Sequence, residues 1–209
     1  MSLSDLPRIE IDSRAGWRAW LEAHHRSSGS IWLVTFKRGR GPHVPYGEVV
    51  DEALCFGWID SRPARLDEDR SMVLLSPRRA GSRWSAVNKA KVAALTEAGL
   101  MAPAGLAAVA RAQADGTWSA LDGVDALEEP ADLTAALDAI PHARGKWDRF
   151  ARSARRGILE WISSARTDAT RARRIAQTAA MASIGLKANF PADTARWRAL
   201  NPSTDSHAG

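Results

Sequence analysis

A short segment of this sequence combines arginine, tryptophan and hydroxyl side chains next to a predicted helix start, a set suited to binding an anion. Arg78 and Arg79 follow a predicted strand, and the next helix is predicted to begin at Ser82 or Ser85. A helix N-terminus presents free N–H groups and partial positive charge, and a guanidinium group binds phosphate or carboxylate through paired hydrogen bonds. The candidate anion site also includes Arg83, Trp84 and Asn88.

Two aromatic or acidic residues of the preceding predicted strand, Trp58 and Asp60, are expected to form the opposite wall of this site across a hairpin. Asp60 beside Arg78 and Arg79 would suit an enzyme that acts on a small anionic substrate, with the carboxylate as base and the arginines as a clamp. The alternative is structural: Asp60 forms an ion pair or a backbone cap, Trp84 belongs to the core, and the arginines form surface ion pairs.

The standard catalytic and metal-binding motifs are absent from the sequence. It contains no G-x-S-x-G, H-E-x-x-H, Walker A or G-x-G-x-x-G pattern. The five histidines lack ligand spacing and there is one cysteine, so we expect neither a metal nor a cofactor. Cys55 lies near the C-terminal end of a predicted helix, where the helix dipole disfavours a thiolate. A buried structural cysteine and a non-catalytic protein are therefore favoured, and no catalytic residue is assigned.

The periodicity of apolar residues and the turn residues predict the elements that would position this site. Spacing of three and four predicts helices, and runs rich in β-branched and aromatic residues predict strands. In the first part of the chain we predict helices over 14–26, 48–56, 82–98 and 103–115, a strand over 31–36, and a hairpin over 58–75 that turns at 67–70. Later in the chain we predict helices over 132–140, 147–165 and from 167 or 168 to about 182.

These elements indicate an α+β fold with a small, mostly antiparallel sheet, packed helices and a C-terminal helical module. We predict an α+β domain over 1–120, with an irregular lead over 1–12, and a linker over 121–130 where Gly, Pro and acidic residues gather. A basic helical module over 131–188 and a loosely ordered tail over 189–209 follow, although Trp197 is a residue that could hold the tail in place.

Divided after residue 130, the sequence has its net charge of +5 in the C-terminal part. Residues 1–130 carry 16 basic and 17 acidic side chains, whereas residues 131–209 carry 13 basic and 7 acidic ones. A basic surface of this kind suits nucleic acid, although no zinc-finger, RRM or basic-zipper signature is present. A solvated helix face or a protein-interaction module over 131–209 are the alternatives. The arginines proposed for a nucleic-acid or partner surface are Arg152, Arg155, Arg156, Arg171, Arg173 and Arg174.

Composition suggests a globular cytoplasmic protein. Hydrophobic residues make up 45% and charged residues 25% of the 209 residues, which is ordinary for a soluble domain. No apolar run reaches the ~18–20 residues that span a bilayer, so we expect no membrane insertion. The N-terminal residues lack the features of a signal peptide, and a single cysteine fits a reducing compartment.

Several motifs of the chain, spread over roughly 13–185, resemble those of the YdeI/OmpD-associated family, which is linked to bacteriocin protection. They are GSIWL (29–33), EALCFGWID (52–60), SPRR (76–79), SRWSAVN (82–88), GLM (99–101), PAG (103–105) and TRARRI (170–175). The resemblance implies a bacterial cytoplasmic protein of envelope stress or cationic-peptide resistance. It brings no catalytic residues. The chain departs from the family pattern at Ser61 and after Phe190.

Overall fold

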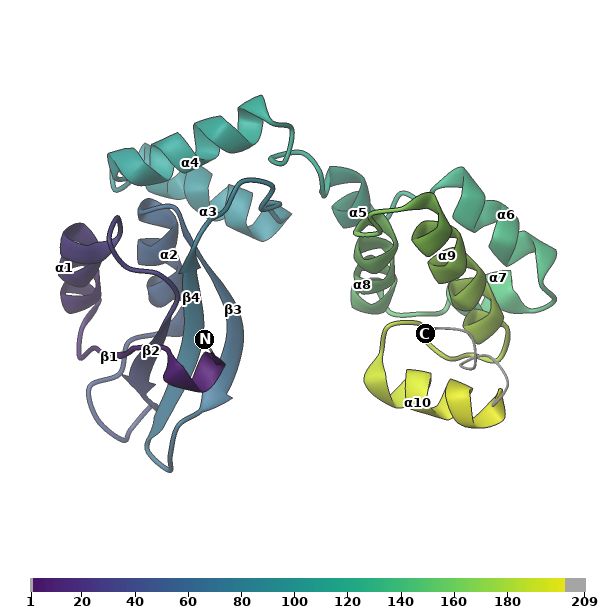
Figure 1. Cartoon of the computed structure of the whole chain (residues 1–209), viewed down its shortest axis with the longest axis horizontal. Helices are drawn as coiled ribbons and strands as arrows, with labels where there is room; N and C mark the ends of the chain where they lie inside the picture. The colour runs from purple at the N-terminus through teal and green to yellow at the C-terminus, as the bar shows by residue number, and fades with distance from the viewer. Residues whose placement is uncertain (1, 202–209) are drawn as a thin grey trace. The chain divides into compact units, whose positions relative to one another are not determined.

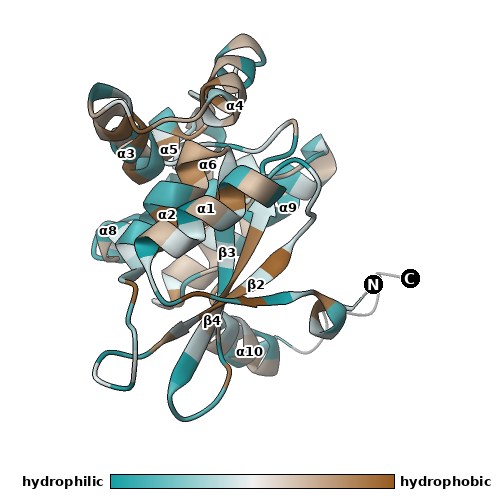
Figure 2. Cartoon of the chain, turned by 90° about the vertical axis from the view of Figure 1, so that its left-hand side faces the viewer, coloured by the Kyte–Doolittle hydropathy of each residue, from teal (hydrophilic) through white to brown (hydrophobic). Residues whose placement is uncertain are grey.

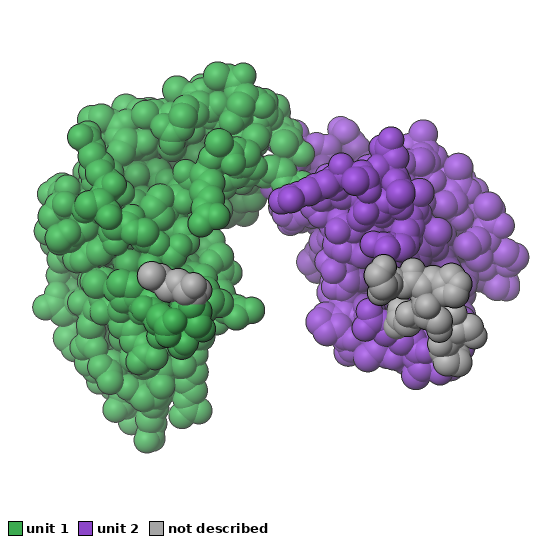
Figure 3. All heavy atoms as spheres, viewed as in Figure 1, with its two compact units in different colours: residues 1–120 green, residues 121–209 purple. Residues whose placement is uncertain are grey.

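The structure is a computed structural model that describes residues 2–201, and it divides into two compact units. Unit 1 is Met1–Ala120 and unit 2 is Leu121–Gly209 (Figure 3). Each unit has its own cluster of buried hydrophobic residues, one built around the sheet and one among helices.

Unit 1 contains a four-stranded sheet with the strand order β1-β2-β4-β3. The strands are β1 (Arg8–Glu10), β2 (Ile31–Phe36), β3 (Trp58–Arg65) and β4 (Arg70–Pro77). β1 runs parallel to β2, and the β2–β4 and β3–β4 pairs are antiparallel. The predicted α+β class is confirmed, and the sheet is mixed rather than purely antiparallel.

The segment predicted as an irregular lead contains β1 and a 3-10 turn, η1 (Leu3–Asp5). β1 has three residues and one partly buried side chain, Ile9, between two exposed charged ones. So short a strand carries almost no periodic signal. It forms because the edge of β2 offers unpaired backbone groups, which its own composition does not reveal.

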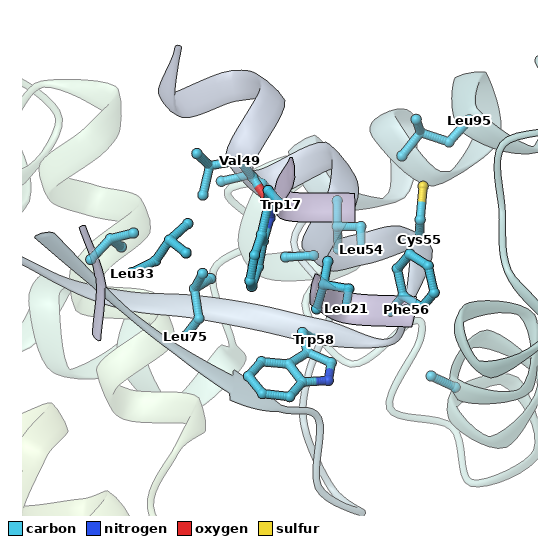
Figure 4. Packing of buried hydrophobic residues seen from close by; sticks show 14 of the residues in the cluster. Trp17, Leu21, Leu33, Val49, Leu54, Cys55, Phe56, Trp58, Leu75 and Leu95 are labelled. Atoms are coloured by element: carbon cyan, nitrogen blue, oxygen red, sulfur yellow. The ribbon is translucent and has the colours of Figure 1, made fainter. Parts of the chain in front are cut away.

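Helices cover one face of this sheet and close one end of it (Figures 1 and 2). They are α1 (Arg14–His24), α2 (Tyr46–Cys55), α3 (Ala86–Glu97) and α4 (Pro103–Ala114). α1 turns Trp17 and Leu21 inward, and both are completely buried. The core of unit 1 packs these side chains against Leu33 and Leu75 of the sheet (Figure 4).

Helix α4 lies unusually close to α2 because it meets that helix through a glycine. A Cβ placed on Gly105 would come within 2.2 Å of the Cys55 carbonyl oxygen. The same oxygen accepts a hydrogen bond from the backbone N–H of Ala102, at 3.1 Å. Backbone contact between the two helices thus fixes where the rest of α4 lies.

The pairing of β3 with β4 decides which side chains of the hairpin face the helices. Trp58 pairs with Pro77, and Ile59 pairs with Ser76. Successive residues of a strand point to opposite faces. Trp58, which is completely buried, therefore faces the core, and Ile59 lies on the opposite face of the sheet.

Unit 2 is helical in its described residues. Its helices are α5 (Asp122–Ala126), α6 (Ala131–Ala139), α7 (Ala143–Trp147), α8 (Arg152–Ser163), α9 (Asp168–Ser183) and α10 (Pro191–Leu200). The helix predicted over 147–165 corresponds to α8 alone, because α7 ends at Trp147 and Ala151 adopts an extended conformation (φ −54°, ψ 146°) before α8 begins. The apolar spacing continues through this break, so it did not reveal the interruption.

Two segments predicted to lack regular structure contain helices. The predicted linker over 121–130 contains α5, whose Val124 is buried in the core of unit 2. The predicted loose tail contains α10, which begins at Pro191 and packs Trp197 against Met181 and Leu186. Both helices are held by tertiary contacts that outweigh their polar composition. Residues 202–209 of the predicted tail lie outside the described residues.

Candidate functional site

Arg78 is a buried arginine at the point where β4 ends. Its backbone N–H donates to the Gly57 carbonyl at 2.9 Å, which extends the pairing of the hairpin by one residue. Its side chain is 8% exposed, whereas the neighbouring Arg79 is exposed. Arginine is almost never buried unless it has partners. Each N–H donor of the Arg78 guanidinium group is therefore expected to have a hydrogen-bond partner.

Three contacts of the Arg78 guanidinium group are clear. Its carbon lies 3.5 Å from the ring centroid of Trp84, a close cation–π stack. Nη1 donates to the Ser82 hydroxyl and to the Arg83 carbonyl, each at 3.3 Å. The ring below and the segment that follows β4 thus hold one side of the group in place.

The other edge of the Arg78 guanidinium group has no acceptor. Nε and Nη2 are buried and make no hydrogen bond to any described residue. Burial lowers the pKa of Arg78 to about 10, and the negative charge of Asp60 opposes that shift. Arg78 is still a cation at neutral pH, so a buried positive charge has two donors without a partner, an arrangement that costs free energy.

The same edge of another arginine shows what it can bind. In unit 2, Arg171 Nε and Nη2 donate to the two oxygens of Asp132, at 2.7 and 2.9 Å. This side-on, two-bond geometry is the usual way in which arginine holds a carboxylate. Arg78 presents the same two donors, and residues 2–201 supply no acceptor for them.

Arg78 lines a small pocket of about 30 Å³ at the junction of the 79–82 segment with α4. Trp84 and the small side chains of Ala108 and Ala112 give it apolar walls, and Arg111 adds a second arginine from α4. The remaining walls are Arg79, Ala80, Ser82, Asp115 and Thr117. The contribution of α4 was not part of the sequence prediction, because the packing that brings α4 here is tertiary.

Asp115 is the acidic residue in the wall of this inner pocket. Its Oδ1 accepts hydrogen bonds from the Thr117 backbone N–H at 3.0 Å and from the Thr117 hydroxyl at 2.5 Å. These bonds lower the pKa of Asp115, so it is a carboxylate at neutral pH. Cationic side chains still outnumber acidic ones around the pocket.

A second, more open pocket of about 330 Å³ shares the 79–82 segment with the first. Its other walls come from Ile59 and Ser76, on the face of the sheet opposite the core, and from Pro77 at the end of β4. We call the first pocket the inner pocket and this one the outer pocket. The segment 79–82 lies in the wall of both.

The predicted site residues divide between these pockets and other tasks. Arg78, Arg79, Ser82 and Trp84 line the inner pocket, as the sequence analysis proposed for a common site. Ser85 is the N-cap of α3 and accepts the Asn88 backbone N–H at 3.3 Å. Arg83 offers its carbonyl to Arg78. The segment before α3 therefore positions Arg78, and the Ser85 hydroxyl is occupied by its capping hydrogen bond.

Trp58 and Asp60 do not form the expected wall. Trp58 lies in the core, where its indole Nε1 donates to the His25 carbonyl at 3.4 Å (Figure 4). Asp60 accepts a hydrogen bond from the Tyr46 hydroxyl and lines neither pocket. Ile59, on the opposite face of the sheet, is the residue of β3 that reaches the outer pocket.

Cys55 is a buried free cysteine, as predicted. Burial raises the pKa of its thiol, and the neighbouring Glu52 raises it further, against a smaller opposing effect of Arg18. A thiol of this kind is protonated at neutral pH and is a poor nucleophile.

The arginines proposed as a nucleic-acid or partner surface are mostly engaged within unit 2. Arg156 binds Asp125 at 2.6 Å and Glu160 at 2.8 Å. Arg152 donates to the Asp125 carbonyl. Arg171 holds Asp132, and Arg174 lies over the Trp161 ring and donates to its carbonyl. Arg173 is exposed, and the buried Nε of Arg155 has no acceptor among residues 2–201.

The charge asymmetry seen in the sequence depends on where the chain is divided. The acidic residues Asp122, Asp125, Glu128 and Glu129 belong to unit 2. With the boundary after Ala120, unit 1 carries 16 basic and 13 acidic side chains, and unit 2 carries 13 and 11. The net charges are then +3 and +2, so charge does not single out unit 2.

Two kinds of feature are absent from the residues that the structure describes: a membrane-spanning helix and a cluster of metal ligands. No helix in residues 2–201 combines the length and apolar character needed to cross a membrane. Within the same residues, histidine, cysteine and acidic side chains form no group of three that could hold a metal ion.

Comparison with known families matches the two parts of the chain to different models. Residues 126–185 match the family described as "Bacteriocin-protection, YdeI or OmpD-Associated". The predicted resemblance is thus confirmed for this part of the chain. Residues 9–108, which hold most of the motifs quoted for that resemblance, match a domain of unknown function (DUF8412). No curated protein and no solved structure matches the chain.

Proposed function

We propose that this chain is a non-catalytic protein of bacteriocin or cationic-peptide protection, and that its unit 1 binds an anionic ligand at Arg78. Residues 126–185 match a family that is described by bacteriocin protection, and we extend this role to the whole chain. The binding role rests on one observation. Arg78 is buried and charged, and two of its donors have no acceptor within the part of the chain that the structure describes.

The argument from this observation is energetic. A buried cation with unmade hydrogen bonds destabilises the folded state, and the stack on Trp84 offsets only part of this cost. An anion that accepts from Nε and Nη2 would offset both the charge and the missing bonds. The site is therefore suited to an anionic group that enters from outside the chain.

The two alternative functions have less support. An enzyme that uses Asp60 with Arg78 and Arg79 requires the carboxylate to face a shared pocket, and Asp60 instead accepts from Tyr46. Nucleic-acid binding requires arginines available to phosphates, and four of the six candidates are engaged by groups of unit 2. Filter binding at low and moderate salt tests the second alternative directly.

The test of anion binding is calorimetric titration of the full chain with acetate and with phosphate at constant ionic strength. We expect saturable binding of at least one of them, a rise in thermal stability with its concentration, and loss of both effects in Arg78→Met. Arg171→Met is the matched control, since it removes an equivalent arginine whose acceptor is internal. The proposal fails if neither anion binds, or if Arg78→Met binds as well as the parent protein.

The protective role is tested in cells that lack the native protein. Complementation with the parent chain should restore survival in the presence of a bacteriocin, and Arg78→Met at equal abundance should not. We place the protein in the cytoplasm because its single cysteine is an unpaired thiol, which suits a reducing compartment. Cell fractionation tests this location.

A further inference from the structure

We infer that the anionic group held by Arg78 is the carboxylate of a monocarboxylic acid, whose remaining atoms lie in the outer pocket. This inference rests on the proposed function and narrows it to one class of ligand. It follows from the geometry of the free donors, the size of the inner pocket and the position of the outer pocket.

The free donors match a planar group with two oxygens. Nη1 of Arg78 is already used by Ser82 and Arg83, so the free donors are Nε and Nη2 on one edge. Arg171 satisfies the same edge with the two oxygens of a single carboxylate, Asp132. A third anionic oxygen, as in a phosphate, finds no further donor on this edge.

The inner pocket also favours the smaller group. A water molecule needs roughly 10–15 Å³ of such space, so about 30 Å³ gives room for about two oxygen positions. A carboxylate has two oxygens, and its carbon can contact the apolar surface of Trp84, Ala108 and Ala112. A phosphate monoester brings three terminal oxygens and a tetrahedral phosphorus into the same space.

The charge of the walls attracts an anion but does not choose between the two groups. Asp115 is ionised, and its carboxylate lies in the wall of the inner pocket. Arg78, Arg79 and Arg111 outnumber it, and both attraction and repulsion grow with the charge of the ligand. The choice of a carboxylate therefore rests on the geometry of the donors and on the size of the pocket.

The segment 79–82 connects the two pockets. Nε and Nη2 of Arg78 each expose less than 1 Å², so a wall of the inner pocket must shift for an anionic group to reach them, and the smaller group requires the smaller shift. Arg79, Ala80 and Gly81 are exposed, and Gly81 has a left-handed backbone (φ +80°) with no neighbouring atom within 4 Å of a Cβ built on it. A ligand that enters here has its other end beside Ile59 and Pro77, in the outer pocket of about 330 Å³.

The experiment compares four probes by calorimetric titration of the full chain at constant ionic strength: acetate, hexanoate, phosphate and hexyl phosphate. We expect hexanoate to bind at least about tenfold more tightly than hexyl phosphate, which corresponds to 1.4 kcal/mol. We also expect hexanoate to bind more tightly than acetate, because its chain buries apolar surface in the outer pocket.

Variants separate the two parts of the inference. Arg78→Lys keeps the charge but presents no two-donor edge, so the preference for carboxylate should fall to within about twofold. Ile59→Ser should weaken hexanoate and leave acetate unchanged. Leu74→Ser is its control, since Leu74 lies on the same face of the sheet and lines neither pocket.

Three results of these titrations would overturn different parts of the inference. Tighter binding of phosphate or hexyl phosphate than of the matching carboxylate overturns the carboxylate assignment and leaves the anion-binding function intact. Equal binding of acetate and hexanoate overturns the role of the outer pocket. Binding of none of the four probes overturns the proposed function itself, and with it this inference.

Discussion

Arg78 of unit 1 and Arg171 of unit 2 present the same edge of the guanidinium group in different surroundings. Arg171 is half-buried and gives Nε and Nη2 to a carboxylate of its own unit. Arg78 is more deeply buried, stacks on Trp84, and has no acceptor for these two donors among the described residues. Four of the six arginines proposed as a surface of unit 2 are engaged by groups of that unit. Arg78 is therefore the arginine that points to a ligand.

The difference shows that the number of arginines is a poor guide to function. The positions of the arginines alone would indicate that unit 2 is the binding unit. Its acidic residues, however, leave it with a net charge of +2, against +3 for unit 1. What distinguishes a binding arginine from a structural one is whether the chain itself supplies the acceptors. Variants of the two groups should therefore change stability in opposite directions.

The largest effect is expected for Arg144→Met in unit 2. Arg144 joins Glu129 at 2.6 Å and Asp138 at 2.8 Å, and Glu129 also accepts from the Trp147 indole N–H. Removal of the arginine leaves a mostly buried carboxylate without its cation, so the free energy of unfolding should fall by about 2 kcal/mol. Urea denaturation measures this change, and a loss below half that value would mean that Arg144 is dispensable.

Arg78→Met should change stability less and in the other direction. The substitution removes a buried charge with two unmade hydrogen bonds and gives up the stack on Trp84. We expect the ligand-free protein to become more stable by about 1 kcal/mol in urea denaturation. A destabilisation as large as that of Arg144→Met would show that Arg78 is a structural residue, and would remove the contrast between the two units.

Arg171→Met should have a still smaller effect. Arg171 and Asp132 form a well-aligned pair, but their side chains are 32% and 47% exposed. Ion pairs at such positions contribute about 0.5 kcal/mol and weaken as salt is added. Denaturation at low and high salt should give a small difference from the parent that shrinks at high salt. An effect that is independent of salt would mean that packing, not the ion pair, is responsible.

Asp60→Asn should have no measurable effect on stability at neutral pH. The variant tests whether Asp60 interacts functionally with Tyr46 or takes part in the Arg78 site. Burial, with the hydrogen bond to Asp60 as the second cause, raises the pKa of Tyr46 to about 12. Since Tyr46 is the single tyrosine of the chain, its ultraviolet titration reports on it alone. The variant should lower this pKa and leave anion binding unchanged.

The sign of the corresponding pH dependence follows from the raised pKa. The unfolded chain loses the tyrosine proton near pH 10, and the folded chain holds it until about pH 12. The contribution of Tyr46 to stability is therefore complete below pH 10 and is lost as the pH rises toward 12. Asp60→Asn should reduce this loss, and anion affinity that falls with Asp60→Asn would instead tie Asp60 to the Arg78 site.

Much of the fold could be predicted from the sequence where an element carries its own periodic signal. The strand 31–36 and the helix that begins at Pro103 were found nearly to the residue, and Ser85 was identified as a cap candidate for α3. β1 was missed because three residues show no period, and α5 because its burial in unit 2 is tertiary. α10 did carry a local signal, Pro191 at the first turn, that was not used.

The candidate site was predictable in its local part and not in its tertiary part. Arg78, Ser82 and Trp84 lie within seven residues, so their proximity follows from the sequence. The face to which Trp58 points follows from the strand register, which the sequence did not determine. The wall formed by Ala108, Arg111 and Ala112 depends on how α4 packs against α2. The spacing of residues in the sequence does not predict such a contact between two helices.

The close approach of Gly105 to the Cys55 carbonyl has a consequence for redesign of the site. Ala108 and Ala112 lie on the same helix, one and two turns beyond the glycine, and both line the inner pocket. Both alanines are also buried in the core of unit 1. Because α4 contacts backbone atoms at Gly105, the helix has little room to move away from a larger side chain at either position. A larger side chain there would therefore close the inner pocket, or destabilise the core, rather than shift the helix.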